Sequence, residues 1–549
     1  MYVICVGISM IPQKVIRTMA SSREPRSKRF RKIGCALSVV QPSPISHLKT
    51  KTSADLSRTV IVRSLFLEIT MKPIIPSILA FLAISLAGCT SVSITEQSIS
   101  PVPAEKSTAP IALTGYWEGE LDIGQSIPIV IGFTFGQPDQ EGILPAALHI
   151  PQQGLKEMKI SASVEELSLH ITMDALMASY EGTYDDESGI IEGTFTQMGQ
   201  SLPLMLRRAQ ASVQRKMQEP VPPYPYISED LRFPQLAEGF SLAGTITRPE
   251  GSGPFPAVVL VSGSGSQDRD ETLFGHKPFL LLADTLTRAG IVVLRYDDRG
   301  FAQSEGDASL ATTFDLAVDT ESAVAYLKTL PYVDQASIGI IGHSEGAIIA
   351  PIVAHRNKDI AFVVLMAGSG VDGIATLEDQ TAAILRAQQA PENYIEQTVA
   401  ANLAIYAVVI DEQKSLEQRK EEVAHILASM GLPSAQVEAQ LGTLFSPWYR
   451  TFLVLDPSRY LGGLSIPVMI LNGTKDTQVS ADLQVSAIEK ALREGGNLRF
   501  TTKIYDGLNH LFQPAITGAV EEYGVIEVTM DPQVLADIAW WVTEGRLQL

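Results

Sequence analysis

The sequence predicts an α/β fold: a mostly parallel β-sheet with helices on both faces and a helical cap, preceded by a smaller antiparallel β domain. After residue 227, near-continuous apolar runs alternate with amphipathic segments, which is typical of a parallel sheet buried between helices. Between residues 113 and 210 the apolar runs are short, alternating and punctuated by glycine, which favours antiparallel strands. A chain of 549 residues with 45% hydrophobic content is too long to fold around a single hydrophobic core, so we expect two or three folded units.

Composition excludes some classes of partner. The net charge of −19 argues against a nucleic-acid partner, because binding nucleic acid requires a basic surface that displaces counterions. The start of the chain is basic instead, because residues 1–88 hold 13 Lys or Arg and 3 Asp or Glu. The three cysteines are Cys5, Cys35 and Cys89, so no thiol after residue 89 is left for a disulfide or a metal.

Residues 71–89 have the composition of a secretory signal peptide. Met71 and Lys72 precede an apolar stretch of about 14 residues, which is too short to span a bilayer but suits a signal sequence. The stretch ends in Leu86-Ala87-Gly88-Cys89, which resembles the bacterial lipobox, and the resemblance implies that Cys89 becomes a lipid-modified N-terminus. The alternative is a buried helix with an inert thiol. We therefore expect a lipoprotein of the bacterial cell envelope, membrane-anchored on its periplasmic or another extracytoplasmic face.

The segments around this signal are expected to lack a core of their own. Residues 1–70 are basic and aperiodic, which indicates a non-structural leader or an over-long gene model, with a transit peptide as the alternative. Residues 90–112 are rich in Ser, Thr and Pro, as a tether would be. Residues 211–226 hold several prolines, which stiffen the backbone and predict a linker.

Residues 113–210 are expected to form a β-sandwich or a small β-barrel. Six strands are predicted, at residues 114–121, 127–134, 167–172, 178–183, 190–195 and 202–206. An accessory role, spacing or orienting the rest of the chain, is favoured over binding of an apolar ligand, because no set of polar groups converges here. Trp117 is expected in the core of this domain.

Residues 227–549 are expected to form the parallel-sheet domain. Residues 227–233 and 240–247 suggest a strand pair. Further strands are predicted at 257–262, 291–296, 338–341, 361–366, 467–472 and 500–505. Helices are predicted at 278–289, 314–330, from 344, and at 481–493 and 534–544.

The alternation breaks between about residues 369 and 464, where Ala, Glu, Gln and Leu recur at helical spacing. Helices are predicted at 374–390, 392–410, 416–430 and 433–444. An insertion between two strands of such a sheet lies over the strand ends where ligands enter, so we interpret it as a cap. Two roles are open for the aromatic side chains near its end: lining an acyl pocket or packing the cap on the sheet. These are Trp448, Tyr449, Phe452 and Tyr460.

The segment Gly342-His343-Ser344-Glu345-Gly346 has the Gly-x-Ser-x-Gly pattern of a nucleophile elbow. It follows an apolar strand and opens into a helix, which is the context that the pattern requires. Asp476 follows the predicted strand 467–472, and His510 follows the strand 500–505. The chain order Ser344, Asp476, His510, each after a strand, predicts a catalytic triad. In a catalytic triad the imidazole of His510 accepts the proton of Ser344, and Asp476 orients the imidazole.

Alternatives exist for two of these roles. Asp456 or Asp506 could replace Asp476 as the orienting carboxylate. His355 and His425 also follow Ser344, but they lie in a predicted helix and in the cap instead of a loop after the last strand.

An oxyanion hole needs two backbone N–H groups that point at the developing charge. Glu345, directly after the nucleophile, supplies one candidate N–H. The glycine-rich turn after the strand 257–262 supplies the other, and Ser264 is the candidate there. We interpret the next four residues, 268–271, as a salt-bridged loop; they lack a metal-ligand spacing with histidine.

Taken together, residues 227–549 resemble an α/β-hydrolase of the exported esterase and serine-aminopeptidase-like group. The motifs that carry the resemblance are Gly263-Ser264-Gly265-Ser266-Gln267-Asp268-Arg269-Asp270, Arg295-Tyr296-Asp297-Asp298-Arg299-Gly300, Gly342-His343-Ser344-Glu345-Gly346, Asn472-Gly473-Thr474-Lys475-Asp476 and Gly507-Leu508-Asn509-His510. Relatives often continue the second motif with x-Gly-x-Ser, whereas Ala302 stands here in place of the glycine. The resemblance implies a hydrolase that needs no cofactor and works through an acyl-enzyme.

The expected function is a serine esterase that hydrolyses a small-molecule carboxylic ester. Peptidase or aminopeptidase-like, thioesterase and acyltransferase activities share the same intermediate and remain alternatives. A more distant alternative is a non-catalytic envelope binding protein in which the β domain acts. The presence of both Ser344 and His510 favours the enzyme.

Overall fold

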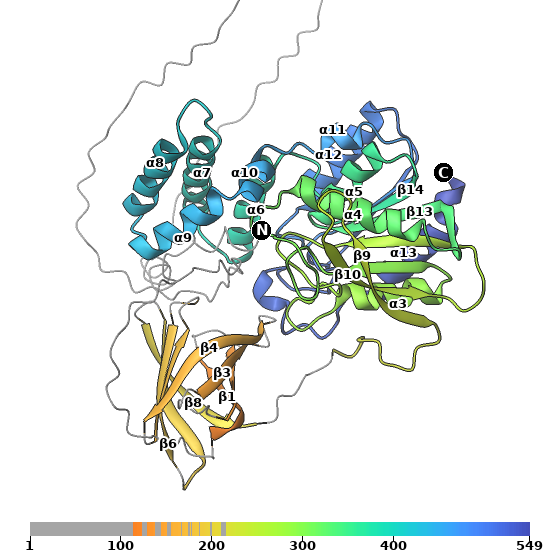
Figure 1. The fold of residues 1–549 in the computed structure, drawn as a ribbon. Helices are drawn as coiled ribbons and strands as arrows, with labels where there is room; N and C mark the ends of the chain where they lie inside the picture. Colours follow the sequence, from red (N-terminus) through yellow and green to blue (C-terminus); the bar gives the residue numbers. More distant parts are fainter. Residues whose placement is uncertain are drawn as a thin grey trace, which may run out of the picture. The chain divides into compact units, whose positions relative to one another are not determined.

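The computed structural model describes residues 113–122, 129–137, 144–150, 155–165, 167–173, 176, 178–185, 187–197, 200–209 and 216–549. The expectations for residues 1–70, for the signal segment 71–89 with Cys89, and for the tether 90–112 lie outside these residues. The described chain forms two separate sheets, drawn in Figure 1. Within the described residues no helix combines the length and the apolarity needed to cross a lipid bilayer.

The first sheet is a closed antiparallel barrel. Its strands are β1 (Gly115–Leu121), β2 (Ile129–Phe135), β3 (Leu144–Ile150), β4 (Leu155–Glu165), β5 (Ser168–Met173), β6 (Ala178–Asp185), β7 (Ile190–Gln197) and β8 (Gln200–Arg208). Each strand pairs with the next, and β1 pairs with β8 to close the barrel. The antiparallel β domain is thus confirmed, and β3 and β4 are two strands that the sequence pattern did not reveal.

The barrel interior is filled by side chains. Trp117 and Tyr180 are buried, and Trp117 Nε1 donates a hydrogen bond to Leu113 O at 2.8 Å. Gly182 and Gly193 face each other on β6 and β7, and a Cβ on either would lie within 2.6 Å of Tyr180 Oη. These glycines therefore make room for the tyrosine ring, and Trp117 belongs to the core as expected.

The second sheet contains eight strands. They are β9 (Ile227–Pro234), β10 (Ser241–Arg248), β11 (Phe255–Val261), β12 (Val292–Tyr296), β13 (Val333–His343), β14 (Ile360–Met366), β15 (Val468–Gly473) and β16 (Phe500–Tyr505). Their order across the sheet is β16-β15-β14-β13-β11-β12-β10-β9. Strands β11 to β16 are parallel, while β10 is antiparallel to both β12 and β9. Because parallel strands end at one edge, the loops after β11, β13, β15 and β16 gather there.

Helices cover both faces of this sheet, as the apolar strands require. The helices outside the cap are α3 (Pro278–Arg288), α4 (Thr313–Leu327), α5 (Gly346–Arg356), α12 (Ala481–Glu494) and α13 (Pro532–Thr543), with short 3₁₀ turns η4 (Val520–Glu522) and η5 (Gly545–Gln548). One apolar core joins the sheet to α4, α5 and α12. A second core joins the sheet to α3 and α13. The predicted α/β class is confirmed.

The cap lies between β14 and β15. It consists of α6 (Gly373–Ala387), α7 (Glu392–Val409), α8 (Leu416–Ser429), α9 (Ser434–Leu444), α10 (Pro447–Val454) and α11 (Ser458–Leu461). Figure 1 shows α6 to α10 gathered beside the sheet. The two short helices α10 and α11 were not expected, and they carry Trp448, Phe452 and Tyr460. The cap thus ends in an aromatic segment that leads back to the sheet.

The segment from residue 216 to β9 is bonded to the domain that follows it. Lys216 Nζ donates to Gly524 O and Ile526 O at 3.0 Å each. Lys277 Nζ donates to Glu219 Oε1 at 2.8 Å, and this ion pair joins the segment to the start of α3.

His276 joins the start of α3 to the segment before α13. The residue is buried, and its Nε2 donates to Tyr523 O at 3.0 Å while Nδ1 lies 2.9 Å from Thr529 Oγ1. A neutral ring fits these partners, because Nδ1 can accept from the Thr529 hydroxyl. Burial, helped by the nearby Lys216 ammonium, lowers the pKa of His276 to about 4.

We predict that acid weakens the fold through His276. The unfolded chain binds a proton at this residue below pH about 6.5, whereas the folded chain does so only near pH 4. The stability contribution is therefore complete above pH 6.5 and is lost as the pH falls toward 4, by up to about 3 kcal/mol. Thermal unfolding between pH 7 and 4 should show a smaller drop in Tm for His276→Gln than for wild type. The exposed cap residue gives the control, His425→Gln, and equal drops in all three proteins would contradict the prediction.

Candidate functional site

The turn between β13 and α5 holds Ser344 in a left-handed backbone conformation. Its φ is +55°, a region that residues other than glycine rarely occupy. A Cβ on Gly342 would lie 2.0 Å from Gly346 O, and one on Gly346 would lie 2.1 Å from Val261 O. The two glycines thus allow β13, α5 and β11 to approach at backbone distance. Ser344 N donates to Met366 O at 2.9 Å, which ties the turn to β14.

Asp476 and His510 are paired at the same edge of the sheet. Asp476 follows β15, His510 follows β16, and His510 Nδ1 lies 2.8 Å from Asp476 Oδ2. The other oxygen, Oδ1, accepts from the N–H groups of Gln478 and Val479 at 2.9 and 2.8 Å. Because the carboxylate accepts, the proton of a neutral His510 lies on Nδ1, and Nε2 keeps a lone pair.

The two alternative carboxylates have other partners. Asp506 Oδ1 accepts from Thr474 Oγ1 at 3.0 Å, and Asp456 Oδ1 accepts from Ser458 N at 3.0 Å. His355 packs edge-on against Tyr460, and His425 is exposed on α8. Of the alternatives weighed from the sequence, none lies in contact with His510.

His343, the residue before Ser344 in the chain, contacts His510. The rings of His343 and His510 have centroids 4.8 Å apart, and His343 Nε2 lies 2.9 Å from His510 O. Among the hydrogen bonds of the described residues, none joins Ser344 Oγ to the His510 ring. Such bonds are often long in unliganded enzymes and tighten when substrate binds.

The two candidate oxyanion donors lie beside the serine. A Cβ on Gly263 would lie 3.1 Å from Ser344 Cβ and 3.6 Å from Oγ, so the glycine-rich turn passes directly over the nucleophile. Within residues 216–549, the backbone N–H groups of Ser264 and Glu345 donate to no other residue. The Ser264 hydroxyl is buried without a hydrogen-bond partner. Both N–H groups are therefore available to an oxygen atom bound at Ser344.

The Glu345 side chain connects the elbow to the cap. Its Oε1 accepts from Thr313 Oγ1 on α4 at 2.7 Å and from Trp448 Nε1 on α10 at 2.8 Å. Tyr449 and Phe452 are almost fully buried in the core, whereas Trp448 is only partly buried. Tyr449 and Phe452 therefore pack the cap on the sheet, and Trp448 lies in contact with the residue next to the nucleophile.

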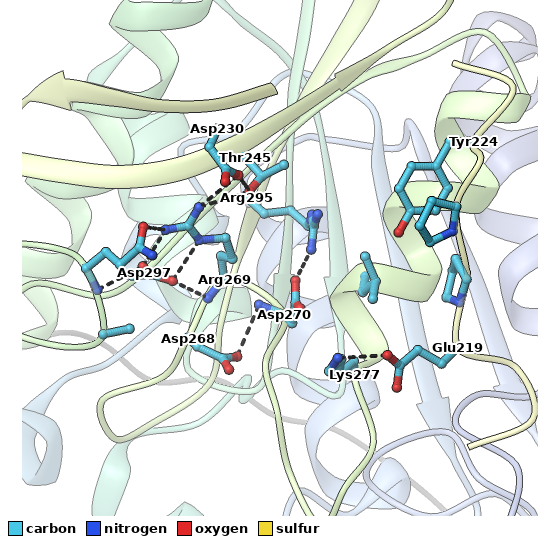
Figure 2. A pocket seen from close by; sticks show the side chains of 15 residues that line it. Glu219, Tyr224, Asp230, Thr245, Asp268, Arg269, Asp270, Lys277, Arg295 and Asp297 are labelled. Atoms are coloured by element: carbon cyan, nitrogen blue, oxygen red, sulfur yellow. Dashed lines mark hydrogen bonds and ion pairs between the residues drawn. The ribbon is translucent and has the colours of Figure 1, made fainter. Parts of the chain in front are cut away.

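The loop of residues 268–271 is salt-bridged, as expected, and borders a polar cavity of about 440 Å³ (Figure 2). Arg269 Nη2 lies 2.6 Å from Asp297 Oδ2, and Asp270 pairs with Arg295. Figure 2 shows Arg269 between Asp297 and Asp230, with Asp270 aimed at Arg295. These pairs fix the loop of residues 268–271, which follows the turn that carries Ser264.

The turn after Asp297 forms with an alanine in place of the glycine. Ala302 has a φ of +47°, so alanine adopts the left-handed backbone at the position where a glycine was expected.

Glu271 and His343 were not identified from the sequence as a pair. Glu271 Oε1 accepts from Gly263 N at 3.0 Å and lies 2.8 Å from His343 Nδ1. The sequence assigns Glu271 to the salt-bridged loop and His343 to a variable position of the elbow. Only the fold brings them together, since 72 residues separate them in the chain.

We predict that Gly342→Ala abolishes the assembled site. The added methyl group would overlap backbone atoms of Gly346 and Ala347, which cannot move without displacing the start of α5. Fluorophosphonate labelling of Ser344 and the melting temperature should both fall. Gly442→Ala is the matched control, because it lies on α9 with no atom near the added methyl group. A variant Gly342→Ala that is labelled like wild type would contradict this account of the turn.

Comparison with known proteins finds similarity to one family model and to several esterases. Residues 277–513 match the family model described as serine aminopeptidase, S33. Esterase EstD of Thermotoga maritima is 28% identical over 305 residues, which are 55% of this chain and 66% of that protein. Esterase FrsA of an Enterobacter species is 24% identical over 202 residues, which are 37% of this chain and 44% of that protein. The chain thus spans less than two thirds of the length of these relatives.

Solved structures with similarity to the chain include an esterase from Pyrococcus furiosus, with a TM-score of 0.37 and 16% identity over 58% of this chain and 91% of that one. A proline iminopeptidase from Mycobacterium smegmatis has a TM-score of 0.37 and 14% identity over 58% of this chain and 99% of that one. The sheet order, the cap between β14 and β15 and the elbow after β13 define the fold independently. Residues 227–549 thus have the fold class that the sequence predicts, an α/β-hydrolase fold with a helical cap.

Proposed function

We propose that this protein is a serine hydrolase that cleaves carboxylic esters through an acyl-enzyme. The observation that carries the proposal is the Asp476–His510 pair, 2.8 Å apart, at the sheet edge where Ser344 stands on a left-handed turn. A serine hydroxyl needs an adjacent base to attack a carbonyl, and an oriented imidazole is the usual one. The esterases of Thermotoga and Enterobacter support the choice of an ester as substrate.

In the proposed reaction Ser344 Oγ attacks the ester carbonyl while His510 Nε2 takes the hydroxyl proton. The oxyanion that forms accepts hydrogen bonds from the N–H groups of Ser264 and Glu345. His510 then gives its proton to the departing alcohol, and the acyl group stays on Ser344. Water, deprotonated by His510, attacks the acyl-enzyme and releases the acid, so that Ser344 regains its proton.

Asp476 keeps its charge through this cycle. Its carboxylate fixes the tautomer of His510 and stabilises the imidazolium that forms in each transition state. Two backbone N–H groups already bind its second oxygen, which keeps the carboxylate from rotating away from the ring. The resemblance to cofactor-free relatives implies that this machinery suffices.

Peptide-bond cleavage is the second candidate, because the matched family model is described as a serine aminopeptidase. It would use the same acyl-enzyme, with an amine in place of the alcohol as the leaving group. Thioester cleavage has weaker support, from a mouse acyl-coenzyme A thioesterase that is 27% identical over 154 residues. A non-catalytic binding role would leave the Asp476–His510 pair without a use.

We predict that Ser344→Ala lowers kcat/KM for p-nitrophenyl acetate and butyrate by at least about 10³-fold, because it removes the nucleophile. The purified protein should also be labelled at Ser344 by a fluorophosphonate. Ser486→Ala, an exposed serine on α12, should leave both readouts unchanged.

The combined readouts separate the alternatives. A wild-type protein that is labelled but inert on esters, and that cleaves aminoacyl-4-nitroanilides, would favour the peptidase. If the wild-type protein is not labelled at all, the enzyme proposal fails.

We also propose that the protein is anchored in the bacterial cell envelope through a lipid on Cys89. The support is the sequence Leu86-Ala87-Gly88-Cys89 at the end of a short apolar segment. An anchor of this kind would present the hydrolase domain to substrates outside the cytoplasm.

We predict that radiolabelled palmitate enters the wild-type protein in bacteria and not the variant Cys89→Ala. The variant Cys35→Ala, which changes a thiol of the leader, should be labelled like wild type. Equal incorporation into the wild-type and Cys89→Ala proteins would refute the anchor.

A further inference from the structure

We propose that Glu271 and His343 form a buried ion pair that positions the catalytic histidine and the oxyanion loop. This inference rests on the proposed function of Ser344 and His510. Neither Glu271 nor His343 touches the reacting atoms in the mechanism above, so both are positioning residues. Glu271 and His343 form a second carboxylate–imidazole pair, and its ring packs against the ring of His510 in the Asp476–His510 pair.

The partners of His343 define its protonation. Nε2 lies 2.9 Å from the backbone oxygen of His510, which can only accept a hydrogen bond. Nδ1 lies 2.8 Å from Oε1 of Glu271, and an ionised carboxylate likewise only accepts. Both ring nitrogens therefore carry protons, which makes His343 an imidazolium paired with a carboxylate.

The surroundings support the charged form. His343 is 4% exposed and Glu271 is 1% exposed, so each would be costly to bury without the other. Burial alone would lower the pKa of His343, but the charge and hydrogen bond of Glu271 outweigh it and raise this pKa. The other groups that face the ring are the Asp476 carboxylate, the His510 imidazole and the Phe512 ring.

The pair joins the three loops that must meet at the reaction centre. Oε1 of Glu271 binds Gly263 N at 3.0 Å and so holds the turn that carries Ser264. His343 is covalently next to Ser344, at the end of β13. Its Nε2–H binds the backbone of His510 itself. One carboxylate oxygen and one ring thus link the oxyanion loop, the nucleophile and the base.

The backbone of Glu271 is strained, which indicates that surrounding contacts hold this residue in place. Its φ is +52°, a conformation that costs a residue other than glycine free energy. Glu271 N donates to Asp268 O at 2.8 Å, and the ion pairs of Arg269 and Asp270 fix the same loop from the cavity side (Figure 2). The hydrogen bond to Asp268 and the ion pairs of Arg269 and Asp270 therefore hold Glu271 in this strained conformation.

The function of the pair follows from the geometry of catalysis. A displacement of a catalytic group by about 1 Å can cost about 100-fold in rate. Without Glu271, the Gly263 N–H and the His343 ring each lose their partner, and the backbone of His510 loses a charged donor. We expect the turnover step to suffer more than substrate binding, because these contacts hold the groups that act on the bound ester.

The test compares Glu271→Gln, Glu271→Ala and His343→Gln with wild type. Rates of p-nitrophenyl butyrate hydrolysis are divided by the number of sites that a fluorophosphonate labels at completion, so that only folded sites are counted. We expect kcat to fall about 10-fold in Glu271→Gln, which keeps hydrogen bonds but loses the charge, and about 100-fold in Glu271→Ala, with KM changed less than about 3-fold. Glu219→Gln, which breaks the ion pair with Lys277 at the cavity, is the matched control and should keep wild-type kcat.

A merely structural role would lower the melting temperature and the number of labelled sites while leaving kcat per site unchanged, and that result would overturn the proposal. So would a kcat for Glu271→Ala equal to that for Glu219→Gln.

A second readout does not depend on activity. Besides the N–H signal of His510 bonded to Asp476, proton NMR of the wild-type protein should show a second strongly deshielded ring N–H signal, which disappears in His343→Gln, shifts upfield in Glu271→Gln and is unchanged in Glu219→Gln. If this signal is absent although the wild-type protein hydrolyses esters, His343 is neutral and the ion pair is refuted. If the wild-type protein neither hydrolyses esters nor is labelled, the proposed function fails, and the NMR signal alone decides whether the pair exists.

Discussion

The left-handed backbone of Ser344 is the constraint on which the rest of the site depends. A residue other than glycine at such a φ costs about 1–3 kcal/mol, and the surrounding contacts must hold it there. Gly342 and Gly346 permit the close approach of β13, α5 and β11, and the bond from Ser344 N to Met366 O fixes the turn. This turn sets the direction of the hydroxyl and exposes the N–H of Glu345. In the proposed mechanism the N–H of Ser264 and the imidazole of His510 must meet the serine in that one orientation.

Two carboxylates near Ser344 and the Asp476–His510 pair hold the parts that meet at this turn. Glu345 binds Thr313 on α4 and Trp448 in the cap, so the cap is attached within one residue of the nucleophile. Glu271 binds Gly263 and His343, so the oxyanion loop is attached to the strand end. The first carboxylate thus connects the turn to the helical insertion.

Local signals made the α/β core predictable from the sequence. Apolar strands, amphipathic helices and the glycine-flanked serine can each be recognised from a short stretch of sequence. Asp476 and His510 follow the last two strands. The barrel strand β4 was missed although apolar and polar side chains alternate from Met158 to Glu165, and α10 and α11 were missed because they are short. Ala302 shows that a glycine rule can be overridden when neighbouring contacts hold the turn. The pairing of Glu271 with His343 depends on tertiary contact across 72 residues, which no local pattern encodes.

In the proposed mechanism Ser344, His510 and the two backbone donors form one reaction centre. A crystal structure of the protein inactivated by an alkyl fluorophosphonate would reveal this arrangement, because the phosphonyl group mimics the tetrahedral intermediate. We expect phosphorus bonded to Ser344 Oγ, with its anionic oxygen within hydrogen-bond distance of the N–H groups of Ser264 and Glu345. His510 Nε2 should face the ester oxygen while its Nδ1 stays bonded to Asp476. A phosphonyl oxygen bound elsewhere, or an adduct on another residue, would contradict it.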